Sequence, residues 1–217
     1  MKAVIFANGV IDPEEQFIPD LNQGDLVIAV DGGAKNALIS GLHPDVVIGD
    51  LDSISDQDKE NLSIQGTRFI TYPHDKDQTD LELALDFALQ NGVEEAILIG
   101  LLGGRLDQTL ANLLLLTKDA YSPMRFVVSA SPDTAHVLVD QHIITIKANT
   151  GDIVSLIPLS PVVSGVTTHN LRWPLNAAKL EFGSTLGISN EMKAPIVSIQ
   201  IDNGKLLVIH RRNLNSS

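Results

Sequence analysis

The sequence contains no cysteine. This absence excludes disulfides, thiolate metal sites and a cysteine nucleophile, and it fits the reducing cytoplasm, where we expect the protein to reside. Basic residues are also few, since 15 Lys and Arg stand against 27 Asp and Glu and give a formal net charge of -12. That charge repels a nucleic-acid backbone, so we expect no nucleic-acid partner.

Long apolar runs are missing as well. No run approaches the roughly 18 residues that span a bilayer, and Asn8 and Gly9 interrupt the short apolar stretch at the N-terminus. We therefore expect neither a signal peptide nor a membrane partner. The sequence does have 44% hydrophobic residues, which predicts an ordered globular protein with a sizeable core.

Residues 1–131 alternate short apolar runs with helical stretches, a pattern typical of an α/β domain with a parallel sheet and crossover helices. The predicted strands are 3–7, 25–30, 46–49, 68–72, 96–100 and 125–129. The clearest helix begins at Thr79, because Thr79 and Glu82 form a capping box and apolar residues then recur on one face.

Residues 132–217 have a different pattern, in which β-rich segments are separated by Gly, Asn, Asp and Pro and no helical period is present. The predicted strands are 143–148, 153–158, 162–168, 196–201 and 206–210. We expect a second, all-β domain, either an antiparallel sandwich or a barrel-like fold.

Carboxylates follow the predicted strands of the first domain, and they are Asp31, Asp50, Asp52, Asp75, Asp77, Asp80 and Asp107. Because the loops after parallel strands gather at one edge of a sheet, we expect these side chains at one rim. Any one of them alone would be an ordinary loop or helix-capping residue. Together they need a cation, because like charges brought close raise one another's pKa.

The residue types indicate which cation. Carboxylate oxygens in loops suit Mg2+ rather than zinc, because no cysteine is present and the six histidines show no ligand spacing. We assign no histidine a catalytic role. Magnesium held by a few carboxylates usually accompanies substrate phosphates, so phosphate is the implied ligand.

Glycines beside the predicted helices offer backbone amides to such a phosphate. Gly32 and Gly33 open one helix, and residues 103–105 (Gly103, Gly104 and Arg105) precede another. Glycine pairs by themselves are typical of tight strand-to-helix turns, but Arg105 and Lys76 add the cations that a polyphosphate needs. No GxxxxGK[ST] or GxGxxG is present, so we expect a different kind of nucleotide site.

Four segments carry a family resemblance: DGGAKNAL at 31–38, PDVVIGDLDSI at 44–54, DKDQTDLELAL at 75–85 and GGRLDQTLANL at 103–113. In order and spacing they resemble the thiamine pyrophosphokinase family. The shorter LRWPL at 171–175 and LGISNE at 186–191 resemble its thiamine-binding part. The resemblance implies a Rossmann-like first domain with helices on both faces of the sheet, a C-terminal β-sandwich, and a homodimer whose active sites lie between subunits.

The resemblance also implies roles for individual residues. Asp50, Asp52 and Asp80 would hold Mg2+. ATP would contact the loop from Asp31 to Lys35, together with Arg105, Asp107 and Asn112. Thiamine would stack on Trp173 and meet the polar pair Ser189 and Asn190. A lone core tryptophan is the alternative for Trp173, although its neighbours Arg172 and Pro174 favour an exposed turn.

The implied reaction is attack by the thiamine hydroxyl on the β-phosphorus of ATP, which yields thiamine diphosphate and AMP. Arg105 and Lys76 would offset the growing charge, and either Asp77 or Asp107 would accept the hydroxyl proton. One alternative is a pyrophosphokinase for another hydroxymethyl heterocycle, such as a pterin. Another is a non-catalytic protein that binds ATP or thiamine, but that function predicts loss of the metal carboxylates, which are all present.

Overall fold

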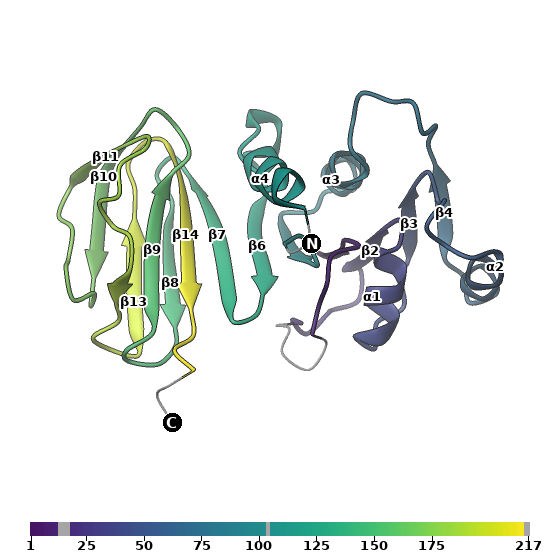
Figure 1. The fold of residues 1–217 in the computed structure, drawn as a ribbon, viewed down its shortest axis with the longest axis horizontal. Helices are drawn as coiled ribbons and strands as arrows, with labels where there is room; N and C mark the ends of the chain where they lie inside the picture. The colour runs from purple at the N-terminus through teal and green to yellow at the C-terminus, as the bar shows by residue number, and fades with distance from the viewer. Residues whose placement is uncertain (13–17, 103–104, 215–217) are drawn as a thin grey trace. The chain divides into compact units, whose positions relative to one another are not determined.

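Figure 1 shows a computed structural model of the chain, which describes residues 1–12, 18–102 and 105–214. The chain divides into two compact units, Met1–Ala130 and Ser131–Ser217. The predicted division between residues 131 and 132 lies one residue from this boundary.

The first unit is built on a parallel sheet. Its strands are β1 (Lys2–Phe6), β2 (Leu26–Val30), β3 (Val46–Gly49), β4 (Arg68–Thr71), β5 (Glu95–Ile99) and β6 (Arg125–Ala130). They pair in the order β4-β3-β2-β1-β5-β6, and every pair is parallel. The apolar strands β1, β2, β3 and β5 are buried along nearly their whole length, as expected for strands covered on both sides. The strand predictions for this unit are confirmed with ends that differ by at most one residue.

Helices connect these strands. They are α1 (Gly33–Ile39), α2 (Asp56–Ile64), α3 (Asp80–Gln90) and α4 (Leu106–Leu115), followed by a short 3-10 turn η1 (Asp119–Tyr121). The predicted start of α3 is confirmed, because Thr79 Oγ1 accepts a hydrogen bond from Glu82 N at 3.2 Å. The Glu82 carboxylate pairs with Lys118 Nζ at 2.5 Å, so an ion pair replaces the second half of the capping box. No helix within the described ranges combines the length and hydropathy of a membrane span.

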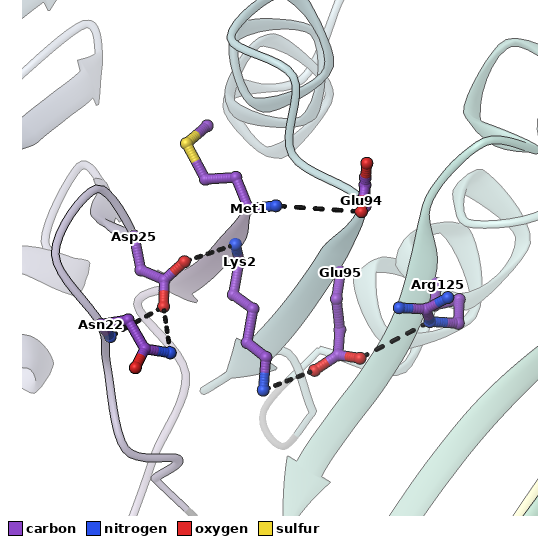
Figure 2. A network of polar contacts seen from close by, with 7 residues as sticks. All are labelled: Met1, Lys2, Asn22, Asp25, Glu94, Glu95 and Arg125. Carbon is purple, nitrogen blue, oxygen red and sulfur yellow. Dashed lines mark hydrogen bonds and ion pairs between the residues drawn. The ribbon is translucent and has the colours of Figure 1, made fainter.

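A polar network closes the edge of this sheet where its strands begin (Figure 2). Asp25 Oδ1 accepts a hydrogen bond from Lys2 N at 2.7 Å. Glu95 pairs with Lys2 Nζ at 3.4 Å and with Arg125 Nε at 3.5 Å. Backbone hydrogen bonds from Asn22 and Lys2 hold the pKa of Asp25 below its usual value. This network therefore connects the starts of β1, β2, β5 and β6. The predicted site residues lie at the other edge of the sheet, after the carboxyl ends of the strands.

The second unit is antiparallel. Its strands are β7 (Asp133–Val139), β8 (Ile143–Lys147), β9 (Ile153–Pro158), β10 (Val162–His169), β11 (Ala178–Glu181), β12 (Asn190–Glu191), β13 (Ile196–Gln200) and β14 (Lys205–Arg211). One sheet has the order β12-β9-β14-β7 and the other β11-β10-β13-β8. Both sheets contribute to one core, which includes Leu156 and Val208 from the first and Val166 and Ile199 from the second. Of the two predicted arrangements, the sandwich is therefore the one observed.

Candidate active site

The segments after the parallel strands are packed too closely for side chains at several positions, of which Gly33 and Gly49 are the tightest. A Cβ at Gly33 would lie 2.0 Å from the Phe6 carbonyl oxygen, and a Cβ at Gly49 would lie 1.8 Å from Asp31 Oδ1. Only glycine fits at such distances. The ends of β1, β2 and β3 are therefore held against one another, and the Asp31 carboxylate lies directly beside the end of β3.

Two polar side chains that the sequence did not single out support the same loops. Asn36 Nδ2 donates hydrogen bonds to the carbonyl oxygens of Ala7 at 2.7 Å and Gly9 at 2.8 Å, which fixes the segment after β1. Ser53 Oγ accepts a hydrogen bond from Gly32 N at 3.2 Å. The signal for Asn36 was a polar residue inside the motif 31–38, directly before the apolar residues Ala37 and Leu38.

The turn that carries Asp50 and Asp52 has an unusual backbone. Leu51 between them and Asp31 across from them adopt left-handed φ angles of 63° and 46°, which non-glycine residues rarely do and which cluster at functional sites. Leu51 N donates to Asp31 Oδ1 at 3.1 Å, and Asp52 N donates to Asp50 Oδ1 at 3.2 Å. The bond from Asp52 N holds the pKa of Asp50 below its usual value.

Asp31 is the carboxylate that this arrangement perturbs most clearly. Burial raises its pKa, the hydrogen bond from Leu51 N opposes that rise, and the nearby carboxylates of Asp80 and Asp50 add to it, giving a pKa of about 7. Asp31 and Asp50 lie in the loops after β2 and β3, and Asp80 is the first residue of α3. Of the seven carboxylates expected at this rim, Asp31 therefore interacts with two others, Asp80 and Asp50.

Lys76 supplies positive charge to this group. Its Nζ lies 2.8 Å from Asp80 Oδ1, with the two side chains only 16% and 23% exposed, and it also donates to the Pro73 carbonyl oxygen at 3.1 Å. Contact with Asp80 raises the pKa of Lys76, and the charges of Asp50 and Asp31 raise it further. We define Asp31, Asp50, Lys76 and Asp80 as the acidic cluster.

The loop that carries Lys76 is anchored by a second set of residues that the sequence did not reveal. Gln78 Nε2 donates to Asp86 Oδ2 at 2.9 Å, and the buried Tyr121 donates through its hydroxyl to Asp86 Oδ1 at 2.7 Å. Asp86 lies on α3, so the loop before this helix is tied to the helix itself. Gln78 lies in the motif 75–85, but nothing local in the sequence pairs it with Asp86.

Arg105 and Asp107 pair with each other at the start of α4. Arg105 Nη2 lies 2.5 Å from Asp107 Oδ2, and both side chains are largely exposed. This contact holds the pKa of Asp107 below its usual value. Asn112 Nδ2 donates to the Leu101 carbonyl oxygen at 3.4 Å, which ties α4 to the segment after β5. The predicted contacts at Gly103 and Gly104 lie outside the described residues.

The predicted thiamine contacts lie together in the second unit. Trp173 is 57% exposed, so it is not a core residue, and the Arg172 guanidinium lies 5.0 Å from the centroid of its ring. Asn190 is buried and exchanges hydrogen bonds with the Trp173 backbone. Ser189 is exposed with a left-handed φ of 57°, and its N donates to Ser155 Oγ at 3.0 Å.

Comparison with known proteins identifies the family. Residues 17–128 match "Thiamin pyrophosphokinase, catalytic domain", and residues 141–206 match "Thiamin pyrophosphokinase, vitamin B1 binding domain". The chain belongs to the thiamine pyrophosphokinase family. The acidic cluster lies within the first matched segment, and Trp173, Ser189 and Asn190 lie within the second.

Individual relatives agree with this assignment. The thiamine pyrophosphokinase of Bacillus subtilis (strain 168) is 32% identical over 189 residues, which cover 85% of this chain and 88% of that protein. Thiamine pyrophosphokinase 1 of Oryza sativa subsp. japonica is 31% identical over 78% of this chain and 67% of that protein. The crystal structure of the Bacillus subtilis enzyme matches with a TM-score of 0.83 at 29% identity and covers 99% of this chain and all of that one.

The donor set of this family member has the chemistry that Mg2+ needs. Asp31 and Asp80 are close enough to raise the pKa of Asp31, and a bound cation would relieve that repulsion. Within residues 1–12, 18–102 and 105–214, however, no three Asp, Glu or His side chains are gathered as a ready metal-binding group. Asp52, Asp75, Asp77 and Lys35 are exposed. The assignment of Asp50, Asp52 and Asp80 as metal ligands therefore stays a prediction.

Proposed function

We propose that this member of the thiamine pyrophosphokinase family transfers the pyrophosphoryl group of ATP to the hydroxyl of thiamine, forming thiamine diphosphate and AMP. The observation that carries the proposal is the presence of both matched domains, catalytic and vitamin B1 binding, in one chain. A pyrophosphokinase for a pterin would not need the second domain, so this match favours thiamine over other hydroxymethyl heterocycles.

In the proposed step, the thiamine hydroxyl oxygen forms a bond to the β-phosphorus as the bond from that phosphorus to the α,β-bridging oxygen breaks. AMP leaves with the electron pair of the broken bond, and the hydroxyl proton passes to a carboxylate. Arg105 and Lys76 donate hydrogen bonds to phosphate oxygens. Because the Asp107 carboxylate is already paired with Arg105 at 2.5 Å, we favour Asp77 as the proton acceptor.

Nucleotide and metal binding belong to the rim of the first unit in this proposal. Lys35 is exposed and free of the tight packing that encloses Gly32 and Gly33, so it is the member of the loop from Asp31 to Lys35 best placed to reach a phosphate. Asp50, Asp52 and Asp80 would hold Mg2+, which when bound would neutralise charge on the phosphates. The strand order reverses at β1, which supports a Rossmann-like arrangement with helices on both faces and a ligand at the switch point.

Thiamine binding belongs to Trp173 and Ser189. Thiamine carries a permanent positive charge on a flat ring, and an indole face attracts such a cation with about 0.5–2 kcal/mol. Trp173 is exposed enough to offer its ring, and the exposed Ser189 hydroxyl would serve as the polar anchor. The predicted cytoplasmic location and the absence of nucleic-acid and membrane partners stay as proposals.

A homodimer is also part of the proposal, and the surface of α4 supports it. This helix has no buried residue, and Leu106, Leu110 and Leu114 are 81%, 57% and 42% exposed at a spacing that places them on one face. A second copy of the chain would cover this apolar stripe. We expect Leu110→Glu to convert a dimer into a monomer in light scattering, whereas Leu38→Glu, which changes an exposed leucine on α1, should not.

Product analysis tests the central proposal. Purified protein is incubated with ATP, Mg2+ and thiamine, or with a hydroxymethylpterin in place of thiamine, and the nucleotides are separated. We expect AMP and thiamine diphosphate in equal amounts and no pterin product. ADP with thiamine monophosphate would refute the proposal.

A substitution tests the metal assignment separately. Asp52→Asn should reduce turnover about 100-fold or more, because a lost metal carboxylate removes several kcal/mol of charge stabilisation. Thiamine affinity should be unchanged. Near-normal turnover of the variant at saturating Mg2+ would remove Asp52 from the ligand set.

A further inference from the structure

We infer that Asn190 is a positioning residue that holds Trp173 in place for the thiamine ring, and that it does not itself contact thiamine. The inference rests on the proposed role of Trp173 and revises the expectation that Asn190 is a direct ligand contact. It is carried by the hydrogen bonds, burial and stacking around the turn 171–173, all within the second unit.

The Asn190 side chain binds both polar groups of the Trp173 backbone. Trp173 N donates to Asn190 Oδ1 at 3.1 Å, and Asn190 Nδ2 donates to the Trp173 carbonyl oxygen at 2.7 Å. Asn190 Oδ1 also accepts from Glu191 N at 2.9 Å. These bonds use three of the four that an asparagine amide can form, and the residue is only 3% exposed. Little of the amide is left for a ligand.

The indole of Trp173 depends on this anchoring because Trp173 is 57% exposed and is not enclosed by the core. Its orientation therefore comes from its backbone and from its neighbour Arg172. The Arg172 guanidinium lies over the ring, and its Nη1 lies 2.9 Å from Glu191 Oε2. Arg172 therefore covers one face of the indole, and a cationic ring would stack on the opposite face.

The strand next to Asn190 completes the support. Leu171 and Met192 form an antiparallel bridge and are 2% and 0% exposed, so the start of the Trp173 turn is attached to the core. Asn190 itself pairs with Val154 on β9. The amide thus connects an exposed aromatic side chain to a rigid sheet, which is the arrangement that keeps a binding residue preorganised.

Trp173 is the only tryptophan in the chain, so its fluorescence reports on this residue alone. We compare wild type, Asn190→Ala, Asn190→Asp and the control Asn91→Ala, which removes another side-chain amide that donates to a backbone carbonyl, that of Phe87 at 2.8 Å. Asn190→Asp keeps the acceptor for Trp173 N and loses the donor to its carbonyl oxygen. Steady-state anisotropy, thiamine and ATP affinity, and melting temperature are measured on each.

Asn190→Ala should lower the Trp173 anisotropy and weaken thiamine affinity about tenfold, the effect of losing more than one hydrogen bond, with ATP affinity unchanged. Asn190→Asp should fall between this variant and wild type, and Asn91→Ala should match wild type in anisotropy and thiamine affinity. If Asn190→Ala does not fold, the comparison of Asn190→Asp with wild type decides. Unchanged anisotropy and thiamine affinity in a folded Asn190 variant would overturn the inference.

The same measurements distinguish failure of the proposed function from failure of the inference about Asn190. If thiamine neither binds wild type nor changes its Trp173 fluorescence, then Trp173 is not the thiamine platform and the proposed function fails. The anisotropy of Trp173 then tests separately whether Asn190 holds this residue. A lower anisotropy in the Asn190 variants would support that structural role, and an unchanged anisotropy would refute it.

Discussion

Two carboxylates, one in each unit, have opposite environments. Asp152 in the second unit is 1% exposed, and it accepts hydrogen bonds from Asn213 N at 2.9 Å, from Asn149 N at 3.2 Å and from His210 Nε2 at 2.8 Å. Burial favours its neutral form, but these hydrogen bonds outweigh burial and hold its pKa below the usual value. Asp31 in the first unit accepts one backbone hydrogen bond and faces other carboxylates, so its pKa rises to about 7.

The contrast separates a carboxylate whose charge is compensated within the fold from one whose charge is not. Three hydrogen-bond donors compensate the burial of Asp152, so its charge stabilises the fold. The same hydrogen bonds connect the turn before β9 to β14 and to the segment that follows β14. The charge of Asp31 is poorly compensated within the chain and destabilises the fold near neutral pH. Uncompensated charge of this kind is typical of sites that await a charged ligand. The following variants test this difference.

The largest expected effect is on stability in the second unit. Asp152→Asn places an amide opposite the donors of Asn149 and His210, and breaking a buried pair of this kind costs about 3–5 kcal/mol. Urea unfolding followed by Trp173 fluorescence, which reports on this unit, measures the loss. Asp133→Asn is the matched control. Asp133 Oδ2 lies 2.9 Å from Arg211 Nη1 in a more exposed ion pair, which should contribute less than about 1 kcal/mol to stability. An equal loss of unfolding free energy in the two variants would show that the buried hydrogen bonds of Asp152 stabilise the fold no more than the exposed ion pair of Asp133.

The next effect is on turnover. Asp31→Asn keeps a residue type that tolerates the left-handed φ of 46°, but it removes one charge from the acidic cluster. We expect turnover to fall about 100-fold, the loss expected when several kcal/mol of charge stabilisation are removed, while stability is retained. AMP formation and urea unfolding measure the two quantities. Asp25→Asn, at the opposite edge of the sheet (Figure 2), should leave turnover unchanged.

The pH dependence of stability should also separate the two carboxylates. Folded protein keeps the Asp31 proton up to about pH 7, whereas the unfolded chain releases it near pH 3.8. Wild type should therefore lose stability relative to Asp31→Asn as pH rises between these values, and the difference should be constant above them. Asp152 has a lowered pKa, so its stabilisation is complete above pH 3.8 and is lost only at lower pH. Urea unfolding from pH 3 to pH 8 without divalent metal tests both trends, and a flat difference between wild type and Asp31→Asn would contradict the first.

The smallest expected effect concerns Lys76. Lys76→Met removes the positive charge 2.8 Å from Asp80 Oδ1, so the acidic cluster should repel itself more strongly and stability without divalent metal should fall by about 1 kcal/mol. Added Mg2+ should restore more stability to the variant than to wild type. Lys59→Met is the control, because Lys59 pairs with Asp56 on α2 at 3.9 Å and lies outside the cluster. Identical Mg2+ responses in wild type and Lys76→Met would show that Lys76 does not compensate the cluster.

The sequence predicted the strands of the parallel sheet and the start of α3, because continuous apolar runs and a capping residue are local signals. It did not predict β7, β11 or β12. The segment of β12 has two residues, Asn190 and Glu191, and becomes a strand only because Asn190 and Glu191 pair with β9. Pairing of this kind depends on a partner that is distant in the chain, so no local pattern reveals it.

The sequence by itself determined that carboxylates follow successive strands and that the motifs are those of one enzyme family. Only the tertiary structure decided which of these groups interact: Asp31 with Asp80, Lys76 with Asp80, Gln78 with Asp86, and Asn190 with the Trp173 backbone. The physical reason is the separation along the chain of the residues that interact. Apolar periodicity is set by neighbours along the chain, whereas a pKa or a hydrogen bond depends on burial and on distances of a few ångströms between residues that folding brings together.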